Sequence, residues 1–151
     1  MQAIEEAIKV IVSGLLETYG TLNPYELCEY LGIEIIKSNL GNDIKGFFQR
    51  TPEGYEIVHI NSELDEHEMK YICAHELGHA ILHTDVSLGF FIENIMQIKN
   101  KYEIQADKFA AELLVAFDFN EQLGSDLCID QLSSILCVPE KLIKYKFSLD
   151  N

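Results

Sequence analysis

The chain has 151 residues, of which 48% are hydrophobic, and its 25 acidic and 11 basic residues give a formal net charge of −14. This length is typical of one hydrophobic core, so we expect a single domain over residues 1–151. Such an acidic surface repels a phosphate backbone, and no cluster of Lys or Arg compensates for it, which argues against direct binding of nucleic acid. The charge would attract a basic protein segment. It is explained equally well by a role in keeping the domain soluble.

The sequence indicates neither a membrane segment nor an oxidising compartment. No apolar run approaches the roughly 20 residues of a membrane span, and the N-terminus carries Glu5 and Glu6 where a secretion signal has positive charge. The cysteines occur singly, which predicts buried free thiols rather than disulfides or a thiolate zinc site. They are Cys28, Cys73, Cys128 and Cys137. We therefore expect a cytoplasmic protein.

The N-terminal part of the chain has the pattern of two helices. Apolar residues recur at the spacing of one helical face through residues 4–15, and Gly20 marks the end of that helix. Asn23 is a favourable N-cap, and Pro24 suits the first position of a second, short helix that ends around Gly32.

From Ile33 the hydrophobic period changes to two, which predicts strands. Three segments have this pattern, and they read IEIIK, KGFFQR and YEIVHI. The last two flank residues 51–54, where Pro and Gly occupy the second and fourth places of a type I turn. We therefore predict a small three-stranded antiparallel sheet.

Two long helices are predicted after the sheet. Ser62 and Asp65 form a capping-box pattern at the start of the first, which ends near His83 and has acidic residues crowded at its positive end. A loosely patterned apolar stretch follows at residues 86–96. The second helix has a strong pattern and is expected over residues 101–116.

The C-terminal segment, residues 118–149, has helical pieces on either side of Pro139, which resembles the rhythm of a helix-turn-helix. A DNA-binding regulator is therefore one alternative for the whole protein. However, the lysines of the last helix alternate with apolar residues and do not form a face that reads bases. We interpret the segment as a packing or docking subregion.

The segment CAHELGHAILH, residues 73–83, contains the motif HExxH within an apolar run. At about 100° per residue, His75 and His79 lie on one side of a helix and can reach the same ion. Glu76 is turned away from the pair but lies near enough to hold a water bound to zinc, as water activation requires. Buried polar residues are costly without partners, which disfavours a chance occurrence of the motif. Gly78 indicates that another element approaches this helix closely.

A catalytic zinc site usually has three protein ligands, so a third is expected outside the motif. Apolar residues at helical spacing define a buried face in the later helix, and Glu103 extends that face, with Asp107 one turn further along. Glu103 as third ligand, with Asp107 accepting a hydrogen bond from a histidine ligand, would explain both acids. Alternatively, both acids lie in the solvated first turn of the helix, where negative charge interacts favourably with the helix dipole. The pattern supports the two explanations equally.

HELGHAILH followed by EIQADKFAAELL resembles the ImmA/IrrE family of metallopeptidases, which pairs a HELGH helix with an ExxxD and FAxxLL helix in the gluzincin manner. The resemblance spans most of the chain. It implies that His75, His79 and Glu103 bind zinc, that Glu76 is the general base, and that Asp107 supports a ligand.

The chain departs from the family pattern at two places. Many members have an acid at the position of Gln105, and many continue with Met-Pro where this chain has Val115 and Ala116. Neither position is needed to hold zinc. If Gln105 replaces an acid that orients another group, the departure changes the residues that surround the ligands.

The resemblance also implies a fold and a role. The fold is α+β, a mostly helical zincin-like domain whose small sheet packs on the HExxH helix. The role is that of a zinc-dependent endopeptidase that cleaves a helix-turn-helix repressor and so derepresses genes of a mobile element or prophage. The acidic charge would suit a basic DNA-binding substrate.

The alternative is a zinc-binding regulatory protein that binds a repressor or another partner without cutting it. The intact Glu76 argues for catalysis instead.

Three further side chains lie near the motifs. His83 is a further turn away from His79, and we interpret it as a residue of the helix C-terminus rather than a ligand. Tyr71 and Tyr102 are candidates for stabilising an oxyanion, although packing is the more common role of such tyrosines.

Overall fold

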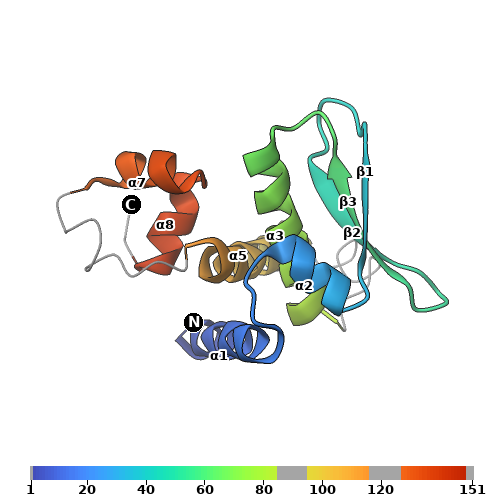
Figure 1. Cartoon of the computed structure of the whole chain (residues 1–151), viewed down its shortest axis with the longest axis horizontal. Helices are drawn as coiled ribbons and strands as arrows, with labels where there is room; N and C mark the ends of the chain where they lie inside the picture. Colours follow the sequence, from blue (N-terminus) through green and yellow to red (C-terminus); the bar gives the residue numbers. More distant parts are fainter. Residues whose placement is uncertain (1, 85–94, 116–126, 149–151) are drawn as a thin grey trace.

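A computed structural model describes residues 2–84, 95–115 and 127–148 of the chain (Figure 1). Most of these residues are helical and a small sheet packs against one helix, so the predicted α+β class is confirmed. In chain order the elements are α1 (Gln2–Tyr19), α2 (Pro24–Tyr30), β1 (Glu34–Ser38), β2 (Gly46–Arg50), β3 (Glu56–Asn61), α3 (Glu66–Leu82), α5 (Ile95–Leu114), α7 (Ile129–Leu136) and α8 (Glu140–Lys146). No helix in the described ranges has the length and apolar character needed to cross a membrane.

The first two helices have the predicted boundaries. α1 ends at Tyr19, and Pro24 opens α2. The side chain of Asn23 accepts a hydrogen bond of 2.9 Å from the backbone N–H of Tyr25. Asn23 therefore satisfies an N–H group that the first turn of a helix leaves without a backbone partner.

The sheet is mixed, and the prediction of an all-antiparallel sheet is wrong for one pair of strands. The strand order is β1-β3-β2; β2 and β3 form the expected antiparallel hairpin, whereas β1 runs parallel to β3. Alternation of apolar and polar residues shows which side chains share a face, but it carries no information on the direction of a neighbouring strand. Residues 39–45 carry the chain from one edge of the sheet to the other.

The buried side chain of Asn61 holds this crossing loop in place. Its amide nitrogen donates to the carbonyls of Gly41 and Ile44, each at 2.8 Å, and its oxygen accepts from the N–H of Glu63 at 3.0 Å. These bonds satisfy loop carbonyls in the way that strand pairing would. The sequence pattern did not single out Asn61.

The turn predicted at residues 51–54 joins β2 and β3. The N–H of Gly54 donates to the carbonyl of Thr51 at 2.9 Å, and the N–H of Thr51 donates to the carbonyl of Tyr55 at 2.8 Å. Gly54 has a φ of +97°, a conformation that favours glycine because other residues have a Cβ atom.

α3 begins at Glu66 with Asp65 as its N-cap, later than the start predicted at Ser62. The side chain of Asp65 accepts a hydrogen bond of 2.8 Å from the N–H of Glu68. Ser62 still belongs to the end of the sheet, because its N–H donates to the carbonyl of Ser38 at 2.9 Å. α3 lies against the sheet on one side and crosses α5 on the other (Figure 1).

α5 begins at Ile95, well before the predicted start at Lys101. The stretch predicted as loosely patterned lies outside the described residues, except for its last two residues, which open α5. The close approach predicted from Gly78 is confirmed, because a Cβ atom at this position would lie 3.1 Å from the carbonyl oxygen of Ala106 on α5. The missing side chain therefore lets the two helix backbones meet.

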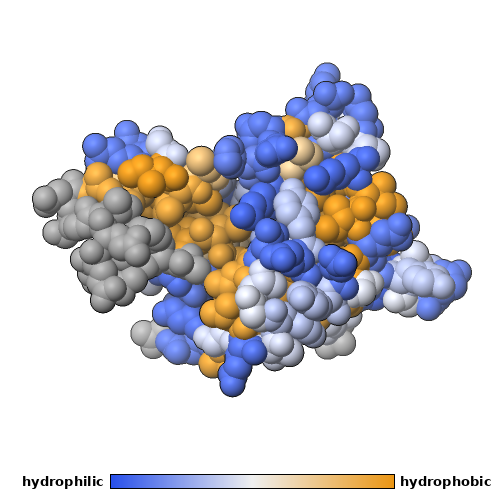
Figure 2. Space-filling view, in the orientation of Figure 1, coloured by the Kyte–Doolittle hydropathy of each residue, from blue (hydrophilic) through white to orange (hydrophobic). Residues whose placement is uncertain are grey.

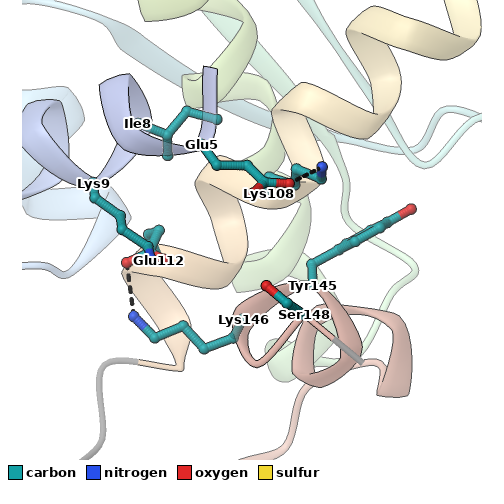
Figure 3. Close-up of a pocket in the computed structure, with 8 residues that line it drawn as sticks. All are labelled: Glu5, Ile8, Lys9, Lys108, Glu112, Tyr145, Lys146 and Ser148. Atoms are coloured by element: carbon teal, nitrogen blue, oxygen red, sulfur yellow. Dashed lines mark hydrogen bonds and ion pairs between the residues drawn. The ribbon is translucent and has the colours of Figure 1, made fainter. Parts of the chain in front are cut away.

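Two ion pairs attach other helices to α5 (Figure 3). Lys108 pairs with Glu5 of α1 at 2.6 Å, and Lys146 of α8 pairs with Glu112 at 2.7 Å.

Residues 118–126 and 149 of the predicted C-terminal subregion lie outside the described residues. Figure 2 shows apolar surface over α7 and α8.

The prediction of buried thiols is correct for two of the four cysteines. Cys28 and Cys73 are buried with their sulfur atoms 3.9 Å apart, whereas Cys128 and Cys137 are exposed. The exposed pair forms the N-cap and C-cap of α7.

Gly46 begins β2 beneath α3, where a side chain has no space. A Cβ atom at this position would lie 2.6 Å from the carbonyl oxygen of His59 and would press against Cγ2 of Ile72. We expect Gly46→Ala to lower the free energy of unfolding by about 1–3 kcal/mol, because the sheet or α3 has to shift. Urea denaturation measures this change.

Gly14→Ala is the matched control, since nothing lies within 4 Å of a Cβ atom at this position of α1. It should raise the free energy of unfolding by about 1 kcal/mol, because alanine favours a helix over glycine. A Gly46→Ala protein as stable as the wild type would contradict the packing described for β2.

Candidate metal site

Three donor groups from two helices meet at one point. Nε2 of His75 lies 3.1 Å from Oε2 of Glu103, and Nε2 of His79 lies 2.7 Å from Oε1 of the same carboxylate. The three ligand atoms lie within 4.8 Å of one another, so a single ion could bind all of them. Two imidazole nitrogens and a carboxylate oxygen are donors that divalent transition metals favour, and the residues therefore fit such an ion.

The second nitrogen of His75 is held by a buried carboxylate. Nδ1 of His75 lies 2.8 Å from Oδ1 of Asp107, and the hydroxyl of Tyr71 donates to that same oxygen at 2.7 Å. Nζ of Lys141, on α8, lies 3.0 Å from Oδ2. Because donors engage both oxygens, Asp107 is a fixed acceptor that keeps Nε2 of His75 directed at Glu103.

The second nitrogen of His79 is held by another ring. Nδ1 of His79 lies 2.8 Å from Nδ1 of His83, and Nε2 of His83 lies 2.9 Å from Oε1 of Gln105. The ring of Tyr102 packs on His83 with ring centroids 4.3 Å apart. His83 therefore contacts the candidate ligand His79 and is not one of the three converging donors.

Glu76 lies beside the three donors. Its side chain is 9% exposed, and its Oε1 is 3.9 Å from Nε2 of His75. Burial raises the pKa of this carboxyl group, and the neighbouring side chains of His75 and His79 act in the opposite direction. The arrangement places a carboxylate of raised basicity next to the point where an ion would bind.

Opposite charges control protonation in the metal-free site. Burial lowers the pKa of His75, but hydrogen bonds to Asp107 and Glu103 outweigh burial and raise it to about 10. Burial raises the pKa of Glu103 and of Asp107, yet hydrogen bonds to the histidines hold both below their usual range. Both carboxylates are therefore ionised at neutral pH and provide negative charge for a divalent cation.

The structure removes the alternative explanation for the two acids of α5. The helix begins at Ile95, so Glu103 and Asp107 lie in its middle and not in a solvated first turn. Tyr71 donates its hydrogen to Asp107, which does not support a role at an oxyanion. The contact of Lys141 with Asp107 could not be predicted from the sequence, because no spacing pattern relates two helices so far apart in the chain.

The fold and the converging donors define a helical α+β protein with a His-His-Glu group that could hold a metal ion. A peptidase family model described as the IrrE N-terminal-like domain matches residues 28–148. The chain is 32% identical over 148 residues to metallopeptidase ImmA of Bacillus subtilis (strain 168), covering 95% of this chain and 85% of that relative. The chain belongs to the ImmA/IrrE family of metallopeptidases.

Two further proteins are similar. "Uncharacterized immunity region protein 2" of Bacillus phage phi105 is 36% identical over 140 residues, covering 92% of this chain and 88% of that protein. A solved structure, a transcriptional regulator of Mycobacterium tuberculosis, shares the fold with a TM-score of 0.62 and 18% sequence identity. That match covers 98% of this chain but only 47% of the regulator, so the chain spans about half the regulator's length.

Loading the site with a divalent metal ion should release protons. At about pH 7.5, His75 of the metal-free chain is protonated because its pKa is raised to about 10, whereas a metal ligand must be deprotonated. The apparent affinity should therefore rise as the pH increases from about 6.5 toward 10. A pH indicator in weakly buffered solution measures the release.

Asp107→Asn is the informative variant for this measurement. It should release fewer protons near neutral pH, because loss of the carboxylate lowers the pKa of His75. Metal binding that does not change with pH over this range would contradict the description of the metal-free site.

Proposed function

We propose that this chain is a zinc-dependent, site-specific endopeptidase. The observation that carries the proposal is the convergence of His75, His79 and Glu103 within 4.8 Å, with Glu76 buried beside them. Three protein donors of this kind leave one coordination position open, as in catalytic zinc sites. When bound, zinc supplies the Lewis acidity that makes water a nucleophile at neutral pH.

Each residue of the site has an assigned task. Glu76 takes the proton of the attacking water and passes it to the leaving amine. Its position 3.9 Å from Nε2 of His75 supports this role. His75, His79 and Glu103 hold the ion, and Asp107 orients the ring of His75 through their 2.8 Å hydrogen bond.

An extended substrate segment would pair with β2. This strand is an edge of the sheet, and within the described ranges no strand pairs with its outer side. Arg50, at the end of β2, donates to the carbonyls of Ala80 and Thr84, so this end of the strand lies beside the last turn of α3. Main-chain hydrogen bonds along β2 would present a peptide carbonyl to the site.

The proposed substrate is a helix-turn-helix repressor that the enzyme would bind in the cytoplasm. The phage relative carries the words "immunity region" in its name, which supports a role in controlling a mobile element or prophage. A basic DNA-binding domain would be attracted by a net charge of −14. Cleavage of the repressor would derepress the genes that it controls.

A second candidate is a zinc-binding regulator that binds a repressor without cutting it. The shared fold with a transcriptional regulator is the observation in its favour. The buried Glu76 favours chemistry instead, because a protein that only binds a partner needs no base beside the ion. Direct DNA binding is less favoured, because Lys141 and Lys146 of α8 pair with acids of α5.

The assignments of ligand and base predict different zinc contents for two variants. Glu103→Ala should lower the zinc content of the purified protein, because it removes one of three donors. Glu76→Gln should retain zinc, because Glu76 is not a ligand. Elemental analysis of both proteins beside the wild type gives the comparison. Equal zinc in the wild type and Glu103→Ala would reject Glu103 as a ligand.

Co-expression with the repressor encoded nearest this gene tests the reaction itself. Mass spectrometry should find the repressor cut at one bond by the wild type, and Glu76→Gln should reduce the cleavage rate by about 10²–10⁴-fold through loss of the general base. An intact repressor that copurifies with both zinc-loaded proteins would favour the regulator that does not cut. An intact repressor without association would exclude it as the substrate.

A further inference from the structure

His83 is a buried histidine that the reaction above does not use. It is 6% exposed at the C-terminal end of α3, one turn after His79. Its ring joins a continuous series of contacts that starts and ends on α5. Gln105 contacts His83 at 2.9 Å, His83 contacts His79 at 2.8 Å, and His79 contacts Glu103 at 2.7 Å.

The chemistry of the end group fixes the direction of these hydrogen bonds. The side-chain oxygen of Gln105 can only accept, so Nε2 of His83 donates to it. The 2.8 Å contact between the two Nδ1 atoms needs one hydrogen, and a His79 ring that binds an ion through Nε2 carries its hydrogen on Nδ1. A neutral imidazole has one donor and one acceptor nitrogen, so Nδ1 of His83 accepts. The hydrogen between the two rings therefore belongs to Nδ1 of His79.

A hydrogen on Nδ1 leaves Nε2 of His79 with the lone pair that a metal ion needs. That nitrogen is the one that lies 2.7 Å from Oε1 of Glu103, at the point where the three donors converge. The packing of Tyr102 against His83, with ring centroids 4.3 Å apart, holds the acceptor ring in place. Each candidate histidine ligand thus has its own acceptor, a carboxylate for His75 and a neutral ring for His79.

We propose that His83 and Gln105 are positioning residues that hold the hydrogen of His79 on Nδ1 and so present its Nε2 to the metal ion. The inference rests on the proposed function, because it requires His79 to be a ligand. It adds two residues to the converging donors. These residues do not touch the ion but orient the side chain of His79, which would bind it. It also gives Gln105 a specific task, since a neutral amide oxygen accepts a hydrogen bond without adding charge.

Zinc affinity, measured by competition with a chromophoric chelator, tests the proposal on the full chain. His83→Phe keeps a ring but removes the acceptor, and it should weaken zinc binding by about 10- to 100-fold. His83→Asn should restore most of the affinity, because its side-chain oxygen can accept the same hydrogen bond. Thermal melting of the metal-free proteins checks that each variant is folded.

Gln105→Met supplies an independent test on the other helix. It removes the amide oxygen from a half-buried position while keeping an unbranched side chain, and it should weaken zinc binding less than His83→Phe does. In the His83→Phe background it should cause no further loss, because Gln105 acts only through His83. A residue that only stabilises the fold would give neither the rescue by Asn nor this non-additivity.

The outcomes separate this proposal from the proposed function. Wild-type protein that binds no zinc would overturn both. Zinc binding by the wild type with equal affinity in His83→Phe, or with equal losses in His83→Phe and His83→Asn, would overturn only the positioning role. If His83→Phe does not fold, wild-type affinity in Gln105→Met overturns the proposal, and a loss in Gln105→Met with retention in His83→Asn supports it.

Discussion

The close approach of α3 and α5 at Gly78 sets the distance between the donor groups of the candidate site. A Cβ atom there would lie 3.1 Å from the carbonyl oxygen of Ala106, so a larger residue would push the two backbones apart. Gly78 lies between the two histidines of the motif, and Ala106 lies between Glu103 and Asp107. The crossing point of the helices is therefore also the centre of the candidate site. At this separation the carboxylate of Glu103 reaches both imidazoles.

The same crossing withdraws polar groups from water, and the surrounding residues compensate for this cost. Asp107 contacts His75, Tyr71 and Lys141, which satisfies both oxygens of a carboxylate that is 8% exposed. Within the described part of the chain, no buried side-chain nitrogen or oxygen lacks a hydrogen-bond partner. Because unpaired buried charges are strongly unfavourable, this network fixes the orientation of the donors.

The helix that carries the acids is also held by its neighbours. Lys108 joins α5 to α1, while Lys146 and Lys141 join α8 to α5. Ion pairs at a protein surface contribute little stability one by one, so their main effect here is on orientation. The position of Glu103 thus depends on segments from both ends of the chain as well as on the motif helix.

The local features of this protein could be predicted from its sequence alone. The four-residue spacing of His75 and His79, the cap at Asn23 and the turn at Gly54 follow from periodicity and backbone preference, which act between neighbours in the chain. Three other features arise only in the folded chain: the parallel pairing of β1, the contact of Lys141 with Asp107 and the series of hydrogen bonds through His83. These features join segments that are distant in the chain or depend on the direction in which a side chain points. Local pattern does not encode either property, because it records which residues share a face and not which element lies against that face.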